Sequence, residues 1–246
     1  MKPTPNPSPE NAPLLAFGAH PDDIEFGCGG VIAVEARAGR PVHFAVCSRG
    51  EAASAGTPEK RAAESERAAE ILGATLEFVE LDGDARLEVR AAHATALAGL
   101  IRRVRPAIVL APSLVENQHP DHFRLGQMVR DATRLARYGG VTELRSTPPH
   151  TVDRLLHYAV TPESEPPGVL PVLIDVSDPE IGNAWTAAME AHSSQTDSRP
   201  YVELQLARAR VHGLRAGVGH AIALFPNDPL LFDSLAPFVR ASSAFP

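Results

Sequence analysis

Cysteine is scarce in this chain, which has only two, Cys28 and Cys47, among 246 residues. Two cysteines do not make a disulfide framework of the kind that small secreted domains use. The sequence also lacks any apolar run close to the roughly 20 residues that cross a bilayer, and residues 1–13 contain no apolar segment like that of a signal peptide. We therefore expect a cytoplasmic protein with reduced thiols and no membrane partner.

Clustered positive charge is missing as well. The chain has 23 lysines and arginines against 30 aspartates and glutamates, and its basic residues are scattered. A nucleic-acid binder needs a concentrated basic surface, so we expect no nucleic-acid partner. The length and the 44% of hydrophobic residues suit one α/β domain with a full core. We expect residues 1–12, rich in proline, to be a disordered tail, and residues 13–246 to form that single domain.

Strand-like and helix-like segments alternate along the first half of the chain. We predict strands at 13–19, 42–47, 76–81 and 106–112, and helices at 29–37, 57–72 and 91–104. Thr57 and Pro58 are typical of a helix start, with a hydroxyl cap followed by proline. This order predicts a Rossmann-like α/β fold, a mainly parallel sheet with helices on both faces. In the commonest strand order the first and fourth strands are neighbours.

The second half of the chain is less regular. Helices are predicted at 122–138, 178–192 and 201–214, and strands at 155–160, 172–176 and 217–225. A proline-rich segment at 162–171 is interpreted as a loop. We expect an irregular C-terminal part that adds to the same domain.

Two similar tetrapeptides, His20-Pro21-Asp22-Asp23 and His119-Pro120-Asp121-His122, follow the first and fourth predicted strands. Open α/β sheets bind their ligands at the carboxyl ends of such strands. His20 and Asp23 have a workable spacing for two ligands of one ion, and His122 could supply the third. Two imidazoles and one carboxylate leave coordination positions open, as a catalytic metal requires.

Two ionisable side chains of these tetrapeptides remain for acid–base chemistry. Asp22 could accept a proton from a metal-activated water. His119 could donate a proton to a leaving amine or stabilise an oxyanion. A single His-Pro-Asp is more often a simple turn, and Asp121 could merely cap the helix that follows. Two copies at matching strand ends favour a functional site.

Other interpretations stay open. Gly27-Cys28-Gly29-Gly30 lacks the full dinucleotide-binding pattern, so close helix–sheet packing is preferred, with an anionic substrate group near the helix start as an option. Two histidines and one carboxylate also form the ligand triad of non-haem iron oxygenases. A catalytically inactive sugar-binding protein is the remaining alternative.

The sequence resembles the PIG-L/LmbE-like family of metal-dependent N-deacetylases over most of residues 13–225. The segments that carry the resemblance are 18–25, 48–51, Arg61 with Glu64, 68–73, 105–106, 119–122, and His192 with Ser194-Gln195. The resemblance implies a hydrolase that removes acetyl from an N-acetylglucosamine conjugate. The substrate that it favours is N-acetylglucosaminyl-malate of bacillithiol biosynthesis, and another small amide is the alternative.

The resemblance also implies roles for the residues of both tetrapeptides. It makes His20, Asp23 and His122 the ligands of one Zn²⁺ per subunit, with Fe²⁺ or another divalent ion as alternatives. Asp22 becomes the general base. His119 becomes the group that stabilises the tetrahedral intermediate or protonates the amine.

Further roles implied by the resemblance concern orientation and substrate binding. Asp121 would orient His119, and Arg61 would contact the substrate. Relatives often carry a tyrosine near the end of the chain where His220 stands here, and some carry an arginine in place of Gln118. We expect both positions to lie near an amino-sugar substrate, and we expect the chain to form a homo-oligomer.

Overall fold

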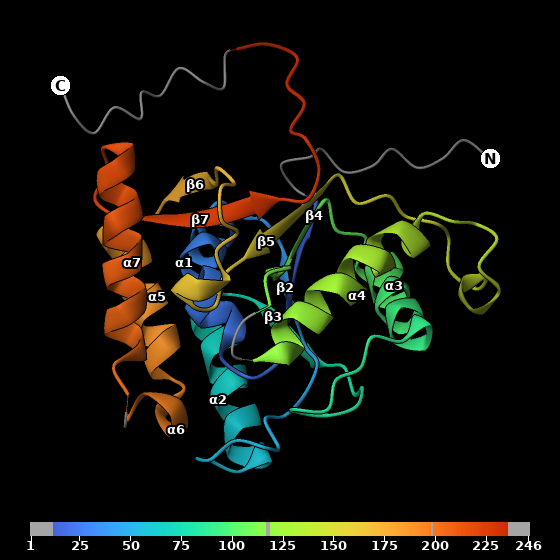
Figure 1. Ribbon diagram of the computed structural model, residues 1–246, viewed down its shortest axis with the longest axis horizontal. Coiled ribbons are helices and arrows are strands. Elements are labelled where there is room, and N and C mark those ends of the chain that lie inside the picture. The colour runs from blue at the N-terminus through green and yellow to red at the C-terminus, as the bar shows by residue number, and fades with distance from the viewer. Residues whose placement is uncertain (1–11, 117–118, 198, 236–246) are drawn as a thin grey trace.

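The fold is built on a seven-stranded sheet with the strand order β3-β2-β1-β4-β5-β7-β6 (Figure 1). The computed structural model describes residues 12–116, 119–197 and 199–235. The strands are β1 (Leu14–Gly18), β2 (Val42–Val46), β3 (Thr75–Phe78), β4 (Ile108–Pro112), β5 (Arg154–Tyr158), β6 (Val172–Asp175) and β7 (Ala221–Pro226).

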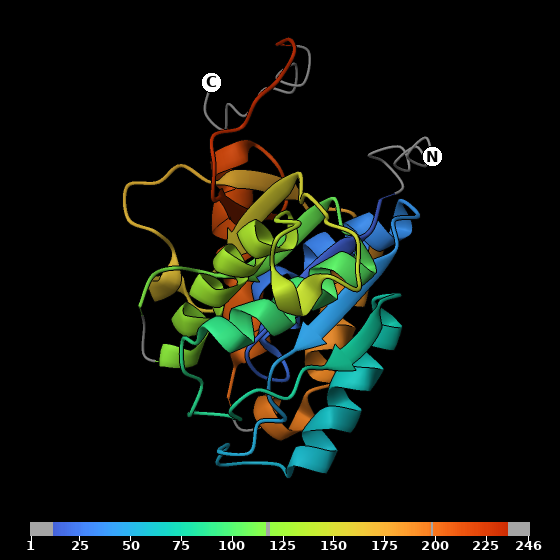
Figure 2. The same cartoon turned by 90° about the vertical axis from the view of Figure 1, so that its right-hand side faces the viewer.

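Helices cover both faces of this sheet (Figures 1 and 2). The α-helices of the described residues are α1 (Asp23–Arg37), α2 (Pro58–Ile71), α3 (Ala91–Val104), α4 (Pro120–Ala136), α5 (Pro179–Glu190), α6 (Ser193–Thr196) and α7 (Tyr201–Ala216). Helix α1 packs with α5 and α7 on one face, and α3 packs along α4 on the other. Each face has its own apolar core, so the sheet is buried on both sides.

Strand β1 lies at the centre of the parallel part of the sheet. It pairs in parallel with β2 on one side and with β4 on the other. All five of its residues are buried, which explains why the segment is continuously apolar and does not alternate. The predicted α/β fold is confirmed, and the carboxyl ends of β1 and β4 lie side by side as expected.

The C-terminal part completes the same sheet. Strand β7 runs antiparallel to both β5 and β6, so the sheet is mixed at this end. Residues 1–11 of the expected tail lie outside the described residues, and the division into a tail and a single domain stays a prediction. Within the described ranges, no helix combines the length and the apolar character that crossing a membrane requires.

Two predicted helix starts were wrong. Helix α1 begins at Asp23 and not at Gly29, because the backbone turns sharply at Asp22 and the Asp22 carbonyl already accepts a hydrogen bond from the Phe26 N–H at 2.9 Å. Helix α4 begins at Pro120, whose fixed φ suits the first helical position, and not at His122. The short helix α6 was not predicted.

Three glycines bring α1 close to its neighbours. A Cβ atom on Gly27 would overlap the ring of Tyr158, and one on Gly29 would lie 2.7 Å from Trp185 Cδ1. A Cβ on Gly30 would lie 2.8 Å from Ile222 Cδ1. The glycine-rich segment of this helix therefore serves packing against the sheet, as the sequence indicated, and also against α5.

Candidate active site

The first tetrapeptide forms a strained turn that fixes a carboxylate. Asp22 has φ 102°, a left-handed conformation that costs a non-glycine residue free energy. Directly after it, Asp23 Oδ2 accepts hydrogen bonds from the backbone N–H groups of Ala19 at 2.8 Å and His20 at 2.9 Å. Asp23 is buried, so its carboxylate is held in one orientation at the start of α1.

The second tetrapeptide brings His122 to the same carboxylate. His122 lies in the first turn of α4, and its Nε2 is 3.0 Å from Asp23 Oδ1. On the other side, His20 Nδ1 is 3.5 Å from Asp23 Oδ2. The three predicted metal ligands are therefore neighbours, with Asp23 between the two histidines.

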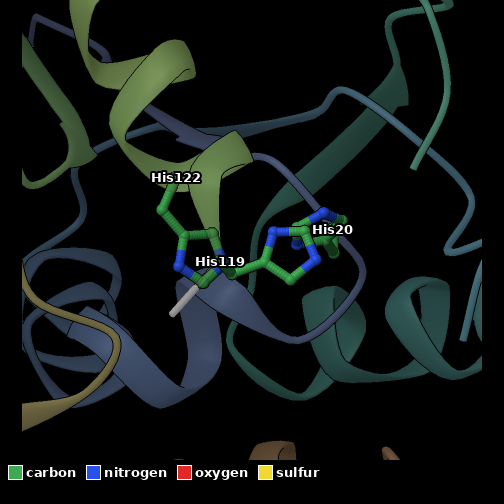
Figure 3. Close-up of side chains that lie close together, drawn as sticks. All are labelled: His20, His119 and His122. Atoms are coloured by element: carbon green, nitrogen blue, oxygen red, sulfur yellow. The ribbon is translucent and has the colours of Figure 1, made fainter. Parts of the chain in front are cut away.

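His119 joins these histidines from the solvent side. Figure 3 shows the three imidazoles together, and the ring centroid of His119 lies 4.3 Å from that of His20 and 5.3 Å from that of His122. The His119 side chain is 36% exposed, against 7% for His20 and 10% for His122. His119 is therefore the histidine of this cluster that a substrate can reach most easily.

A further carboxylate, Asp84 in the loop between β3 and α3, was missed. Its Oδ1 is 3.2 Å from His20 Nε2 and 3.7 Å from His119 Nε2, while Oδ2 accepts a hydrogen bond from the Ala52 N–H. The available signal was its place after the third parallel strand, at the sheet edge that carries both tetrapeptides.

Asp121 contacts the first histidine of the cluster. Its Oδ2 accepts a hydrogen bond from the Ala85 N–H at 2.8 Å and lies 3.4 Å from His20 Nε2. Its Oδ1 is 3.5 Å from Arg124 Nη1. The role expected for Asp121 in orienting His119 stays a prediction.

Arg61 lies beneath the first turn and is 4% exposed. Its Nη2 donates to the Pro21 carbonyl at 2.7 Å and to Asp22 Oδ2 at 3.3 Å, and its Nη1 donates to the Gly50 carbonyl. Gly50 has φ +72°, and a Cβ atom there would overlap the guanidinium. The structure therefore places Arg61 as a support of Asp22, and its predicted contact with substrate stays a prediction.

Of the two remaining predicted substrate residues, the structure describes only His220, and its predicted contact with substrate stays a prediction. His220 lines a groove of about 690 Å³ between α5 and α7, together with Thr186, Glu190 and Arg210. Its backbone N–H donates to Ser177 Oγ at 2.9 Å. Gln118 lies outside the described residues.

A buried layer of charge lies behind Asp22. His192 is fully buried, with Nε2 3.4 Å from Glu25 Oε1. Glu64 accepts hydrogen bonds from the hydroxyls of Ser193 and Ser194. The Glu64 contacts attach the short helix α6 to α2, and the Glu25 carboxylate faces the buried His192 ring from α1.

The two aspartates of the first turn differ in acidity in the metal-free protein. Burial raises the pKa of Asp22 to about 6, and the neighbouring charge of Asp23 adds to this, while Arg61 and His192 oppose it. Burial would also raise the pKa of Asp23, but His122 and His20 hold it well below the usual range. Asp23 is therefore a permanent anion, and Asp22 is a carboxylate that can take up a proton near neutral pH.

The histidines differ as well. Burial by itself would lower the pKa of His20, but the charge of Asp23 and hydrogen bonds to Asp121, Asp23 and Asp84 raise it well above its ordinary value. The pKa of His119 is lowered, first by burial and then by the positive charges of His20 and His122. His119 is thus the more readily neutral imidazole of the two.

These residues fit a divalent metal ion. Two groups of donor atoms, each within 4.8 Å of one another, consist of His20, His119 and His122, and of His20, Asp84, His119 and Asp121. Imidazole and carboxylate ligands suit zinc and other first-row divalent ions. Asp23 touches His20 and His122 but belongs to neither group. The structure thus provides a His/Asp metal centre, as expected, with more donors than the three predicted ligands.

The comparisons with known proteins agree with this chemistry. A family model described as PIG-L, GlcNAc-PI de-N-acetylase, matches residues 15–133, which include both tetrapeptides. The structure of the conserved protein TT1542 from Thermus thermophilus is 32% identical, covers 94% of this chain and 100% of its own, and has a TM-score of 0.82. The chain belongs to the PIG-L family. The predicted family of metal-dependent N-deacetylases, which are hydrolytic enzymes, is thereby confirmed.

Two curated relatives of this PIG-L family protein represent different reactions. The 4-oxalmesaconate hydratase of Pseudomonas putida is 31% identical over 138 residues, which is 51% of this chain and 53% of the hydratase. The diacetylchitobiose deacetylase of Thermococcus kodakarensis is 28% identical over 202 residues, which is 74% of this chain and 69% of the deacetylase. The chain therefore spans about half the length of the first of them.

Proposed function

We propose that this PIG-L family protein is a metal-dependent hydrolase that removes the acetyl group from an N-acetylated amino sugar. The observation that carries the proposal is the position of Asp22. Its carboxylate adjoins a cluster of imidazoles and carboxylates that fits a metal, and Arg61 Nη2 holds it there at 3.3 Å from Oδ2. That combination is what the hydrolysis of an amide by an activated water needs.

The metal would be held by His20, Asp23 and His122. When bound, a divalent ion supplies a Lewis acid for the amide carbonyl and lowers the pKa of a bound water to about 7. Asp22 then accepts the proton of the attacking water. Arg61 keeps the Asp22 carboxylate in place from below, with Nη2 at 3.3 Å from Oδ2.

His119 acts on the other side of the reacting amide. A neutral imidazole can donate one N–H hydrogen bond to the carbonyl oxygen as negative charge develops there. The open position of its ring, at the solvent side of His20 and His122, suits this contact. The leaving amine takes up the proton that Asp22 accepted from the water, and acetate is the second product.

The finer features of the proposal rest on residue types and family resemblance. We propose N-acetylglucosaminyl-malate of bacillithiol biosynthesis as the substrate, zinc as the ion, a cytoplasmic location and a homo-oligomeric assembly. The deacetylase from Thermococcus kodakarensis, named for an N-acetylated sugar, supports the substrate class.

A mass-spectrometric screen of N-acetylglucosamine conjugates with the metal-loaded protein tests this function. We expect equal amounts of acetate and free amine from one conjugate, and at least about 100-fold slower release of both with Asp22→Asn. No hydrolysis of any N-acetyl conjugate by protein that contains metal would overturn the proposal.

A second candidate is hydration of a carbon–carbon double bond, because one curated relative is a hydratase at 31% identity. The same residues could deliver water to an unsaturated acid, with Asp22 as base. The screen should therefore include unsaturated dicarboxylic and tricarboxylic acids. A product heavier by one water, without acetate, would replace the deacetylase proposal with this one.

A further inference from the structure

We propose that Asp84 is a positioning residue for His20: its carboxylate accepts a hydrogen bond from the Nε2–H of that imidazole, which leaves Nδ1 as the atom that binds the metal ion. Glu51, in a sequence segment that the proposed chemistry does not use, holds Asp84 in place. The inference rests on the proposed role of His20 as a metal ligand and does not depend on which amide is the substrate.

The two ring nitrogens of His20 have different neighbours. Nδ1 lies 3.5 Å from Asp23 Oδ2, on the side of the proposed metal ligands, whereas Nε2 lies 3.2 Å from Asp84 Oδ1 and 3.4 Å from Asp121 Oδ2. A neutral imidazole has one N–H and one lone pair. Two carboxylates at Nε2 favour the proton there, so the lone pair is on Nδ1. A histidine that binds a metal commonly donates its other N–H to a carboxylate in this way.

Asp84 is the better placed of the two carboxylates to accept this proton. Its Oδ1 is the nearer atom, and the Oδ2 of Asp121 already accepts a hydrogen bond from the Ala85 N–H at 2.8 Å. The distance of 3.7 Å from Asp84 Oδ1 to His119 Nε2 is too long for a hydrogen bond. Asp84 therefore acts on the metal centre through His20.

The backbone on either side of Asp84 has a left-handed conformation. Gly83 has φ +86°, and Ala85 has φ 61°, although it lacks the conformational freedom of glycine. Strain of this kind persists only where surrounding contacts impose it. The hydrogen bond from the Ala85 N–H to Asp121 is one such contact. The loop is thus held in a costly shape that brings the Asp84 carboxylate to His20.

Glu51 provides further contacts that fix this loop. Its Oε2 accepts a hydrogen bond from the Asp84 N–H at 3.0 Å, and its Oε1 accepts one from the Arg49 N–H at 3.1 Å. In return, Asp84 Oδ2 accepts a hydrogen bond from the Ala52 N–H at 3.1 Å. These reciprocal bonds join the loop after β2 to the loop after β3. They occupy one oxygen of Asp84 and direct the other towards His20.

Replacing Asp84 with asparagine should reverse the preference of the His20 ring. An asparagine side chain has one acceptor oxygen and one NH₂ donor. If the oxygen keeps the hydrogen bond from the Ala52 N–H, the NH₂ group faces Nε2 and favours a lone pair there. Nδ1 then carries the proton, which must be displaced before a metal ion can bind.

Zinc affinity tests the proposal without any substrate. Zn²⁺ binding to metal-free wild type, Asp84→Asn, Glu51→Gln and Asp82→Asn is measured by competition with a chelator. We expect Asp84→Asn to bind about 10–100-fold more weakly, the loss typical for an outer partner of a metal site, and Glu51→Gln to lose less. Asp82 is a matched control, because it lies in the same loop but pairs with Arg90 and His93. Asp82→Asn should keep its affinity within about twofold.

NMR spectra of the histidine rings give a readout that a merely structural role would not change. Protein with isotope-labelled histidine is saturated with zinc, and the His20 signals are assigned from the spectrum of His20→Gln. In wild type we expect a zinc-bound Nδ1 and a protonated Nε2 whose proton exchanges slowly with water. In Asp84→Asn that exchange should be faster, because the carboxylate that binds the proton is gone.

The possible results separate this inference from the proposed function. A zinc-bound Nε2 of His20 in wild type, or unchanged zinc affinity in Asp84→Asn, would overturn the positioning role. If circular dichroism shows that Asp84→Asn does not fold, the same two measurements on Glu51→Gln decide. Zinc on Nδ1 in wild type without hydrolysis of any N-acetyl conjugate would leave the positioning role standing and overturn the proposed function. Wild type that binds no zinc would overturn both.

Discussion

The two His-Pro-Asp tetrapeptides have nearly the same sequence, but the structure uses them differently. In the first, the helix starts at the fourth residue, Asp23, and Asp22 precedes it with a left-handed backbone. In the second, the helix starts at the proline, Pro120, and His119 precedes it with an extended backbone. The corresponding histidines therefore have different surroundings, and His20 is far less exposed than His119.

We expect this difference to separate the residues that hold a metal ion from the residues that act on the substrate. The first turn buries its fourth residue, so its histidine and Asp23 become fixed donors. The second turn leaves its first residue at the mouth of the crevice and buries its third and fourth residues, Asp121 and His122. A motif repeated in sequence does not repeat its function when the helix behind it starts at a different residue.

The largest effect on metal binding and turnover should come from Asp23, in the first tetrapeptide. Asp23→Ala removes the carboxylate between His20 and His122, so we expect loss of the catalytic metal and of essentially all turnover. It also leaves the N–H groups of Ala19 and His20 without their acceptor, which costs about 1–3 kcal/mol of folding stability for each buried donor left unpaired. Metal analysis with thermal unfolding checks both. Normal metal affinity in this variant would show that Asp23 is not a ligand.

The next effect should come from Asp22→Asn. The amide keeps the shape of the side chain and its place above Arg61 but cannot accept a proton, so turnover should fall by about 10²–10⁴-fold with metal retained. Steady-state kinetics on metal-loaded protein measure this. The equivalent change in the second tetrapeptide, Asp121→Asn, should cost less. Equal losses in the two variants would contradict the division of roles.

The third-largest effect on turnover should come from His119→Ala. We expect a loss of about 10²-fold in turnover with one metal ion still bound, because the variant removes one oxyanion donor and leaves His122 in place. Metal content and kcat are measured on the same sample. Complete loss of metal would mean that His119, and not His122, is the ligand of the second tetrapeptide.

A smaller effect concerns pH and the stability of the metal-free protein. Asp22 has a folded-state pKa of about 6, above its ordinary value of 3.8. Between these values the folded state binds more protons than the unfolded state, so this group should favour folding more as pH falls from 6 towards 4. The difference in Tm between Asp22→Asn and wild type should therefore shrink across that window. A difference that grew instead would show that the Asp22 charge is stabilised.

The smallest effect should come from His220→Ala. This histidine lines the groove between α5 and α7, so we expect kcat to change by about twofold or less, the usual range for substitutions away from a special site. A pH–rate profile beside wild type checks this. A large loss would support the sequence-based prediction that His220 reaches the substrate.

The sequence predicted those parts of the molecule that depend on local pattern. Buried parallel strands are continuous apolar runs, and Thr57 and Pro58 mark the start of α2, so β1, β4 and α2 could be placed in advance. Neighbouring strand ends then brought the two tetrapeptides together. The start of α1 could not be predicted, because it depends on a strained residue, Asp22, which sequence rules assign to a turn.

Long-range contacts explain the other features that the sequence did not predict. Asp84 joins the site because the loop after β3 brings its Oδ1 to 3.2 Å from His20 Nε2; its place after a parallel strand indicates the edge of the sheet but not this contact. Arg61 is buried because Gly50, eleven positions earlier in the chain, leaves room for its guanidinium. The antiparallel direction of β7 depends on how α7 returns the chain to the sheet.

The three glycines of α1 have a mechanical consequence. Because Tyr158, Trp185 and Ile222 occupy the space that side chains at these positions would need, α1 has no clearance to slide or rotate. The Tyr158 hydroxyl donates a hydrogen bond to the Phe17 carbonyl, and the Trp185 indole N–H donates one to the Glu25 carbonyl. Both side chains that α1 packs against are therefore held in place. The Asp23 side of the crevice is therefore a rigid wall.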